Sequence, residues 1–412
     1  MGAAVKRADW LPLGLLAGLC VTYGASAVVG WFWLRRYGFS QPDPLLVPGM
    51  SFWSYFGSRF FVWDAQWYDV IARVGYHWYP SATARQSLAF FPLWGLVIRP
   101  IYALTRWHQH LWVLLLILIV AYGSIHLFFR LAQRLVGERA AVIATVLYVF
   151  FPAGHYLLES YPTGLMNLIA LLVLRDVSDG REWRPALIAG IGTAAGPMMV
   201  VPSFLVWLAA VWRRRKRWRE PGALAVLLGI GLVGLGGLLA FVAWQGVALH
   251  DPFAFLAAQR PWDHPRGIGE RLWRFTWMIL VVPDLYHIGR LMGDFVHDLQ
   301  AGALVAAFGR YEFAVNFLFM VLLMVGLFWT IAVKPRLVLL YGCLVVAFFV
   351  WFHGTTHNGI SMMRLLYICA PGFWGLGRAL QREPAWAWGV VGVSVVALVG
   401  QEICSDVGQL VL

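Results

Sequence analysis

Charged residues are scarce in this chain. Asp, Glu, Lys and Arg make up only 13% of its 412 residues, whereas 60% are hydrophobic. Soluble domains carry about 25% charged residues, so this composition excludes a soluble globular protein. The apolar residues form continuous blocks, which predict membrane-spanning helices of about 20 residues. A membrane barrel would instead show short alternating strands.

Cysteines are few and scattered. Cys20, Cys343, Cys369 and Cys404 lie in or beside apolar stretches, with no CxxC spacing and no paired histidine. This pattern indicates small buried hydrophobes rather than disulfides or a zinc site. The sequence also lacks a Gly-rich phosphate loop and a DxD motif, so a soluble nucleotide sugar is not expected.

The chain has one long series of apolar blocks and no visible inverted repeat. The block at 11–33 is too long for the apolar core of a signal peptide, so it predicts a first span. We expect an all-α, polytopic membrane protein with about eleven transmembrane helices, forming a single domain over 1–412. The segment 185–212 is interpreted as two short helices that turn near Gly196-Pro197. The ten later blocks are 109–130, 139–153, 163–175, 185–197, 198–212, 221–243, 313–333, 337–353, 361–378 and 385–403.

The net charge of +12 reflects basic residues in short loops, which are topology signals rather than a nucleic-acid surface. If the first span enters from the cytoplasm, five short basic loops all fall inside. We therefore expect a multi-pass protein of the inner (plasma) membrane. The inside loops contain Arg130, Arg134 and Arg139; Arg175, Arg181 and Arg184; Arg213 to Arg215, Lys216, Arg217 and Arg219; Lys334 and Arg336; Arg378 and Arg382.

Two outside loops are long, at 34–108 and 244–312. Long loops escape the positive-inside rule, so their many arginines suggest an anionic partner. Both are rich in Trp and Tyr, residues that anchor helices at the bilayer surface. We expect interfacial helices in the first loop.

Asp64 lies among aromatic residues in the first outside loop. A carboxylate in such surroundings is costly unless it is paired or used in chemistry, so Asp64 is our candidate general base. The alternative is that it caps the helix that follows. Asp69 lies off the Asp64 face of that helix and is a candidate partner for Arg73 at i+4.

Several motifs in this order resemble the PIG-V family, the GPI mannosyltransferase 2 relatives of the GT-C superfamily. The combination spans most of the chain. The motifs are Trp63-Asp64, Ile71-Ala72, Gly75-Tyr76, Ala89-Phe90-Phe91-Pro92-Leu93, Phe151-Pro152-Ala153 with Tyr156 and Tyr161, Asp251-Pro252-Phe253-Ala254-Phe255 with Gln259 and Trp262, and Ser361 with Arg364, Tyr367 and Pro371.

The resemblance implies a GT-C type glycosyltransferase on the extracytoplasmic face. Such an enzyme moves a hexose, usually mannose, from a polyprenyl-phosphate sugar to a lipid-linked or glycan acceptor, with inversion. The family's Trp-Asp aspartate maps onto Asp64. The chain departs from the pattern after Tyr161, where Pro162-Thr163-Gly164 lacks an acidic residue and Glu159 lies slightly earlier.

The remaining outside segments supply candidate binding residues. His155 and Glu159 are four apart and are either a local hydrogen-bonded pair or acceptor-binding groups. Asp251 is either a helix cap beside Pro252 or, by the resemblance, close to the donor. Arg and Trp side chains suit a phosphate and a sugar face respectively, although surface anchoring is the alternative. The acceptor or sugar set is Trp63, Asp69, His155, Glu159, Tyr161, Asp251, Gln259 and Trp262, and Arg260 and Arg266 join the donor-phosphate set.

Arg364 lies at the start of an apolar block, where a charged side chain is expensive to bury. It either extends to the surface or, with His357, binds the donor phosphate. We favour the phosphate role. Although His353 and His357 are four apart, nearby Gly354 and Gly359 argue against a metal site, and no metal or cofactor is expected.

The expected mechanism has Asp64 take the acceptor proton while His357 and Arg364 stabilise the departing phosphate. Two other functions compete. A secondary transporter would concentrate charge near the bilayer midplane, whereas these apolar blocks are nearly free of Asp and Glu. A catalytically inactive lipid-binding protein is the other alternative, and the presence of Asp64 argues against it.

Overall fold

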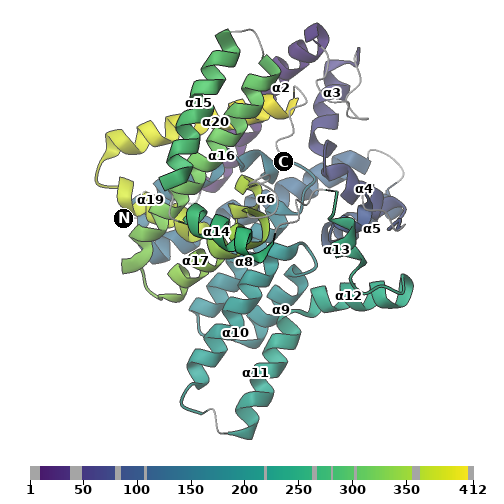
Figure 1. Ribbon diagram of the computed structural model, residues 1–412, viewed down its shortest axis with the longest axis vertical. Coiled ribbons are helices and arrows are strands. Elements are labelled where there is room, and N and C mark those ends of the chain that lie inside the picture. The colour runs from purple at the N-terminus through teal and green to yellow at the C-terminus, as the bar shows by residue number, and fades with distance from the viewer. Residues whose placement is uncertain are drawn as a thin grey trace.

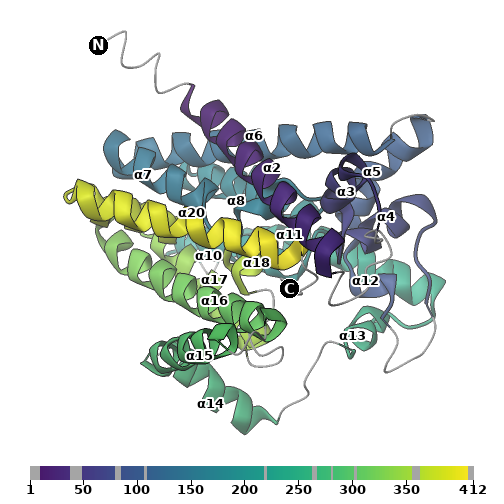
Figure 2. The same cartoon turned by 90° about the horizontal axis from the view of Figure 1, so that it is seen from above.

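The computed structural model describes residues 10–37, 49–78, 85–105, 109–217, 220–261, 267–279, 282–300, 304–354 and 362–406. Every regular element in these ranges is a helix, so the predicted all-α class is confirmed. Long helices form a bundle, and the short helices of the first outside loop gather at one end of it (Figures 1 and 2).

Among the described residues, four helices are long and apolar enough to cross a membrane, or five if the bent pair 222–234 and 236–248 forms one span, as expected of a helical membrane protein. The candidate spans are Leu11–Arg36 in α2 (Leu11–Tyr37), Gln109–Val136 (α6), Ala314–Ala332 in α16 (Leu304–Trp329) and η5 (Thr330–Ala332), and Pro384–Ile403 in α20 (Pro384–Asp406).

Other helices coincide with predicted apolar blocks but are shorter than the roughly 20 residues of a full crossing. The presence of a helix in each of these blocks is confirmed, and the role of each helix as a separate span stays a prediction. They are α7 (Glu138–Val149), α8 (Thr163–Ser178), α9 (Trp183–Gly192), α10 (Val200–Arg214), α17 (Leu337–Phe349) and α19 (Ala370–Leu380).

The single helix predicted at 221–243 is wrong. The chain forms α11 (Pro221–Gly234) and α12 (Gly236–Ala248), bent by 66° at Leu235. A side chain at Gly237 would lie only 2.6 Å from the Gly190 carbonyl oxygen, so glycine permits close contact with α9. Thr193 Oγ1 accepts the Leu238 N–H at 3.0 Å and satisfies a backbone donor released by the bend.

The helix predicted at 361–378 is also broken, into α18 (Met362–Leu366) and α19. Pro371 at the start of α19 has no N–H and prevents one continuous helix. The hydroxyl of Tyr341 donates to the Ile368 carbonyl at 3.2 Å within the break. As a result, Arg364 is carried on a short helix of its own.

The predicted break in 185–212 is confirmed, because α9 ends at Gly192 and η4 (Pro197–Met199) precedes α10. The Ala194 carbonyl in this break accepts the Leu93 N–H at 2.8 Å. Leu93 belongs to α5 in the first outside loop, so that loop contacts the α9–α10 turn.

Both segments that the sequence predicts to be long outside loops contain helices, which were expected for the first of them. The first holds α3 (Phe52–Ser58), η1 (Arg59–Phe61), α4 (Ala65–Arg73), η2 (Ser87–Ala89) and α5 (Pro92–Leu104). The second holds α13 (Ala254–Ala258), α14 (Ile268–Ile279) and α15 (Val282–Gln300). In both views α12 and α13 lie at the same end of the molecule as α4 and α5 (Figures 1 and 2).

Small residues let α19 pack closely against its neighbours. A side chain on Gly375 would meet the Gly326 carbonyl of α16 at 1.7 Å, and one on Gly377 would meet the Ala140 carbonyl of α7 at 2.3 Å. Close backbone contact of this kind is typical of helices packed within membranes. It fixes α19, and the preceding α18 with Arg364, against the rest of the bundle.

Candidate functional site

Asp64 and Arg364 form an ion pair although they lie 300 residues apart. Arg364 Nη1 is 3.1 Å from Asp64 Oδ2, and the two side chains are 17% and 13% exposed. Asp64 occupies the position before α4, yet its side chain makes no capping hydrogen bond. The capping interpretation of Asp64 is therefore wrong, and the carboxylate has a cationic partner instead.

The backbone before Asp64 is unusual. Trp63 has a φ of 57°, which is uncommon for a bulky residue and costs about 1–3 kcal/mol where it persists. The half-buried Trp63 side chain packs on a small cluster formed by Ala27 and Leu34 of α2 with Tyr55 and Val62. Trp63 thus anchors the turn that presents Asp64, and residues with such backbone strain cluster at functional sites.

Tyrosines surround the ion pair. The Tyr161 hydroxyl oxygen accepts the Asp64 N–H at 3.1 Å, and the Arg364 guanidinium lies 5.0 Å from the centre of the Tyr161 ring. The Tyr156 ring lies 5.7 Å from the same guanidinium. Both separations are within cation–π range. Together these contacts hold the charged groups in a mostly aromatic setting.

The phenol groups of Tyr161 and Tyr68 stay neutral at physiological pH. Burial raises the pKa of Tyr161, and the negative charge of Asp64 raises it further. Burial likewise raises the pKa of Tyr68, which lies on α4 with its ring 6.5 Å from that of Tyr161. Tyr161 and Tyr68 can therefore donate or accept hydrogen bonds but do not supply a base.

His155 and Glu159 form the predicted local pair, with Nδ1 and Oε1 2.9 Å apart. They are 1% and 6% exposed, which favours the structural interpretation over contact with an acceptor. Tyr23 of α2 lies beside Glu159, with its hydroxyl oxygen 3.5 Å from Glu159 Oε1. The same hydroxyl donates to the Arg59 carbonyl at 3.2 Å. The pair therefore supports the 154–161 segment from within, while Tyr161 reaches the site.

Two further hydrogen bonds tie the Tyr161 segment to the first outside loop. The Ser160 N–H donates to the Phe60 carbonyl at 2.8 Å, and Trp94 Nε1 donates to Ser160 Oγ at 3.1 Å. Trp94 is buried in α5. Phe60 and Trp94 thus fix the position of Tyr161 relative to Asp64.

Asp69 lies away from the Asp64–Arg364 pair in its contacts. Its carboxylate accepts a hydrogen bond from Arg73 Nε at 2.8 Å, which confirms the predicted i+4 partner, and another from the Tyr102 hydroxyl. Arg73 also donates to Gln109 Oε1 at 3.0 Å. The Asp69–Arg73 pair therefore joins α4 to α5 and α6, and no described contact favours the predicted role of Asp69 in sugar binding.

The second outside loop meets the first through Gln259. Its Nε2 donates to the Ala89 carbonyl at 2.5 Å, beside a cluster that combines Leu88 and Phe91 with Ala254 and Ala258. Gln259 thus supports the 89–93 motif. The two loop segments therefore contact each other at this point.

The other predicted residues of the second loop are less informative. Asp251 Oδ1 accepts the Phe253 N–H at 2.9 Å in the turn before α13. The N-cap of α13 is Phe253 and no side chain caps it, so the capping interpretation of Asp251 is wrong. Arg260 is exposed, and no described residue forms an ion pair with it. Trp262, Arg266 and His357 lie outside the described residues, so their predicted roles remain predictions.

Sequence reasoning missed four supporting residues. Tyr23, Arg59, Trp94 and Ser160 hold the site in place through contacts between distant segments, which no local spacing indicates. Arg59 is 2% exposed, and its Nη1 donates to the Tyr23 carbonyl at 2.6 Å. Tyr68 was also missed, although it follows Asp64 by four residues and shares its helix face.

The arrangement can perform acid–base and anion-binding chemistry. Within the described ranges, no three His, Cys, Asp or Glu side chains gather closely enough to hold a metal ion. In comparisons with known proteins, the chain matches no family model and no curated protein.

Proposed function

We propose that the chain is an inverting GT-C type glycosyltransferase of the kind that the PIG-V resemblance suggests. It would move a hexose, mannose by that resemblance, from a polyprenyl-phosphate sugar to a lipid-linked or glycan acceptor. The Asp64–Arg364 pair is the observation that carries this proposal. It joins the candidate base to the candidate phosphate ligand at 3.1 Å, although the two residues are 300 positions apart in sequence.

In the proposed reaction, an Asp64 carboxylate oxygen takes the proton of the acceptor hydroxyl. The acceptor oxygen then attacks the anomeric carbon from the face opposite the phosphate, and the carbon–oxygen bond to the phosphate breaks with inversion. The bonding electrons leave with the polyprenyl phosphate. Positioning and proton transfer by a general base of this kind typically accelerate reactions by about 10²- to 10⁴-fold.

Arg364 would have two tasks in this mechanism. Its guanidinium is always charged and offers several donors in one plane. It can therefore bind the Asp64 carboxylate in the resting site and also contact a phosphate oxygen of the donor. His357 would complete the phosphate site. Developing charge on the leaving phosphate would then meet a fixed cation in a largely dry, aromatic setting.

The proposed topology has eleven spans with the site outside. Two contacts support it: Leu93 of the first outside loop binds the α9–α10 turn, and Gln259 of the second binds Ala89. Each contact joins two segments that the positions of the basic loops predict to lie on the same, extracytoplasmic side. The protein would lie in the plasma membrane with Asp64 on the extracytoplasmic face.

A catalytically inactive membrane protein is the second candidate, because one observation favours it. Arg364 already has a carboxylate partner, so the pair could serve only to tie α18 to α4. A transporter has no comparable observation in its favour.

The test is to incubate the purified full-length chain with polyprenyl-phosphate mannose and a panel of lipid-linked and glycan acceptors. We expect one acceptor class to gain the mass of one hexose, with the anomeric configuration inverted. Polyprenyl-phosphate glucose serves as the control donor. If no acceptor gains a hexose from either donor, the inactive alternative is favoured.

A further inference from the structure

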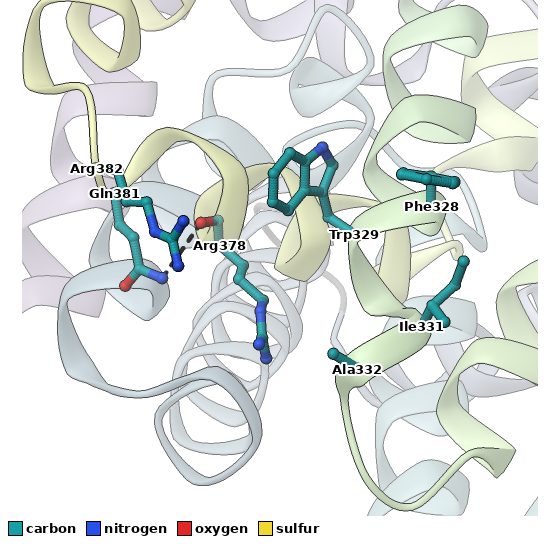
Figure 3. Close-up of a pocket in the computed structure, with 7 residues that line it drawn as sticks. All are labelled: Phe328, Trp329, Ile331, Ala332, Arg378, Gln381 and Arg382. Carbon is teal, nitrogen blue, oxygen red and sulfur yellow. Dashed lines mark hydrogen bonds between the residues drawn. The ribbon is translucent and has the colours of Figure 1, made fainter.

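A pocket lies where η5 meets the end of α19. It has a volume of about 330 Å³ and is lined by Phe328, Trp329, Ile331, Ala332, Arg378, Gln381 and Arg382. Figure 3 shows the arginines and Gln381 on one side and Phe328 and Ile331 on the other. The pocket therefore combines two cationic groups with an apolar wall.

The arginines of this pocket differ from others on the same predicted side of the membrane. Several of those pair with carboxylates of the chain itself. Within the described ranges no carboxylate forms an ion pair with Arg378 or Arg382, even though the exposed Glu383 is adjacent in sequence. The paired examples are Arg134 with Asp179 at 2.8 Å, Arg214 with Glu182 at 2.6 Å, and Arg175 with Asp176 at 3.0 Å. Arg378 and Arg382 are thus available to an external anion.

The apolar wall lies at the end of a candidate span. Phe328, Trp329 and Ile331 are 69%, 42% and 55% exposed, and they belong to the span Ala314–Ala332. A tryptophan and arginines at a span end are typical of the depth at which lipid headgroups lie. A soluble anion would leave this apolar surface uncovered, whereas acyl chains would cover it.

An adjoining pocket of about 260 Å³ shares Gln381 with the first one. It lies between α7 and α20 and is lined mostly by apolar side chains, including Val142, Ile143 and Val391, with Arg139 at its edge. Together the two pockets offer apolar surface on both sides of Gln381. Such an arrangement suits a ligand with one anionic head and two hydrocarbon chains.

We infer that Arg378 and Arg382 bind the phosphate headgroup of an anionic glycerophospholipid whose chains lie along the apolar surfaces beside Gln381. By the positive-inside rule, this lipid belongs to the cytoplasmic leaflet. Basic pockets between membrane helices recognise anionic lipid headgroups in this manner. The inference requires the helices to lie in a membrane and is independent of the proposed transfer reaction.

The test uses the delipidated full-length protein and native mass spectrometry with phosphatidylglycerol or phosphatidylcholine as the probe. We expect the wild type to retain phosphatidylglycerol preferentially. Arg378→Gln/Arg382→Gln should bind it at least about tenfold more weakly. The matched control is Lys216→Gln/Arg217→Gln, which removes the same charge from an exposed basic loop and should bind like the wild type.

The outcomes separate the alternatives. Equal retention of the two lipids by the wild type, or unchanged phosphatidylglycerol binding by the Arg378/Arg382 variant, would overturn the inference. Displacement of the lipid by millimolar inorganic phosphate would overturn it too, because a simple anion site would then suffice. If the double variant fails to fold, Arg382→Gln alone, at an exposed position, should still weaken phosphatidylglycerol binding relative to the Arg217→Gln control, and unchanged binding there would contradict the inference.

Discussion

The hydroxyl oxygen of Tyr161 accepts a hydrogen bond from the backbone N–H of Asp64 at 3.1 Å. Tyr161 also places its ring 5.0 Å from the Arg364 guanidinium. One side chain therefore positions both members of the ion pair, from a segment far from either in sequence. This relationship makes Tyr161 a positioning residue for the candidate base.

Tyr161→Phe should separate these two contacts. The variant keeps the ring beneath Arg364 and loses the hydrogen bond to the Asp64 backbone, a bond of about 1 kcal/mol. We expect sugar transfer to fall by about fivefold to tenfold, with nearly unchanged thermal stability. Tyr68→Phe is the matched control, since it removes a neighbouring phenol hydroxyl without an observed hydrogen bond, and it should retain transfer. Equal losses in the two variants would contradict the positioning role.

Arg364→Gln should destabilise the protein because it leaves the Asp64 carboxylate without its cation. Breaking a fully buried pair costs about 3–5 kcal/mol, and exposed pairs contribute at most about 1 kcal/mol. Since both side chains are slightly exposed, we expect the free energy of unfolding, measured for the detergent-solubilised protein, to fall by about 2 kcal/mol. Adding Asp64→Asn should restore part of that stability. Additive losses in the double variant would show that the two groups do not interact.

Ser160→Ala should loosen the segment that carries Tyr161. The variant leaves the buried Trp94 N–H without its acceptor, which costs about 1–3 kcal/mol. We expect lower thermal stability and reduced transfer together. Ser203→Ala is the matched control, because Ser203 Oγ of α10 donates to the carbonyl of Gly234 in α11 at 2.6 Å. Ser203→Ala should lower thermal stability without a specific loss of sugar transfer. If Ser160→Ala and Ser203→Ala lose the same amount of transfer for the same loss of stability, Ser160 has no specific link to the site.

Acid should weaken the link between Glu182 and Arg214. The Arg214 hydrogen bond lowers the pKa of Glu182 below its ordinary value of about 4.3. The depressed pKa contributes stability that is fully present above pH of about 4.3 and is lost as the pH falls through the folded-state value. Thermal unfolding of Glu182→Gln should therefore depend less on pH below about 5 than unfolding of the wild type. Identical pH profiles would contradict this contribution.

The sequence predicted the parts of the site better than their contacts. Asp64, Tyr161 and Arg364 were each identified from local residue type and from family resemblance. Their pairing was not predicted, because a contact across 300 residues leaves no spacing pattern. The Asp69–Arg73 pair was predicted because an i+4 spacing in a helix suffices to indicate it. Its third member, Tyr102, comes from another helix and was missed.

The fold shows the same limit. Hydrophobic blocks located the helices, and a Gly-Pro pair indicated the break between α9 and α10. The 66° bend at Leu235 was not predicted, because 221–243 is uniformly apolar. The bend depends on tertiary contacts, namely the close approach of Gly237 to Gly190 and the hydrogen bond from Leu238 to Thr193. Such contacts override a local pattern.

The most direct measurement of the central claim compares mannose transfer by Asp64→Asn and Asp69→Asn in purified protein with polyprenyl-phosphate mannose. Asp64 immediately precedes α4 and Asp69 lies within that helix, and each binds an arginine. We predict that Asp64→Asn expresses and folds but transfers at least about 10²-fold less sugar, while Asp69→Asn retains most transfer. Wild-type turnover by folded Asp64→Asn would contradict the assignment of Asp64 as the general base.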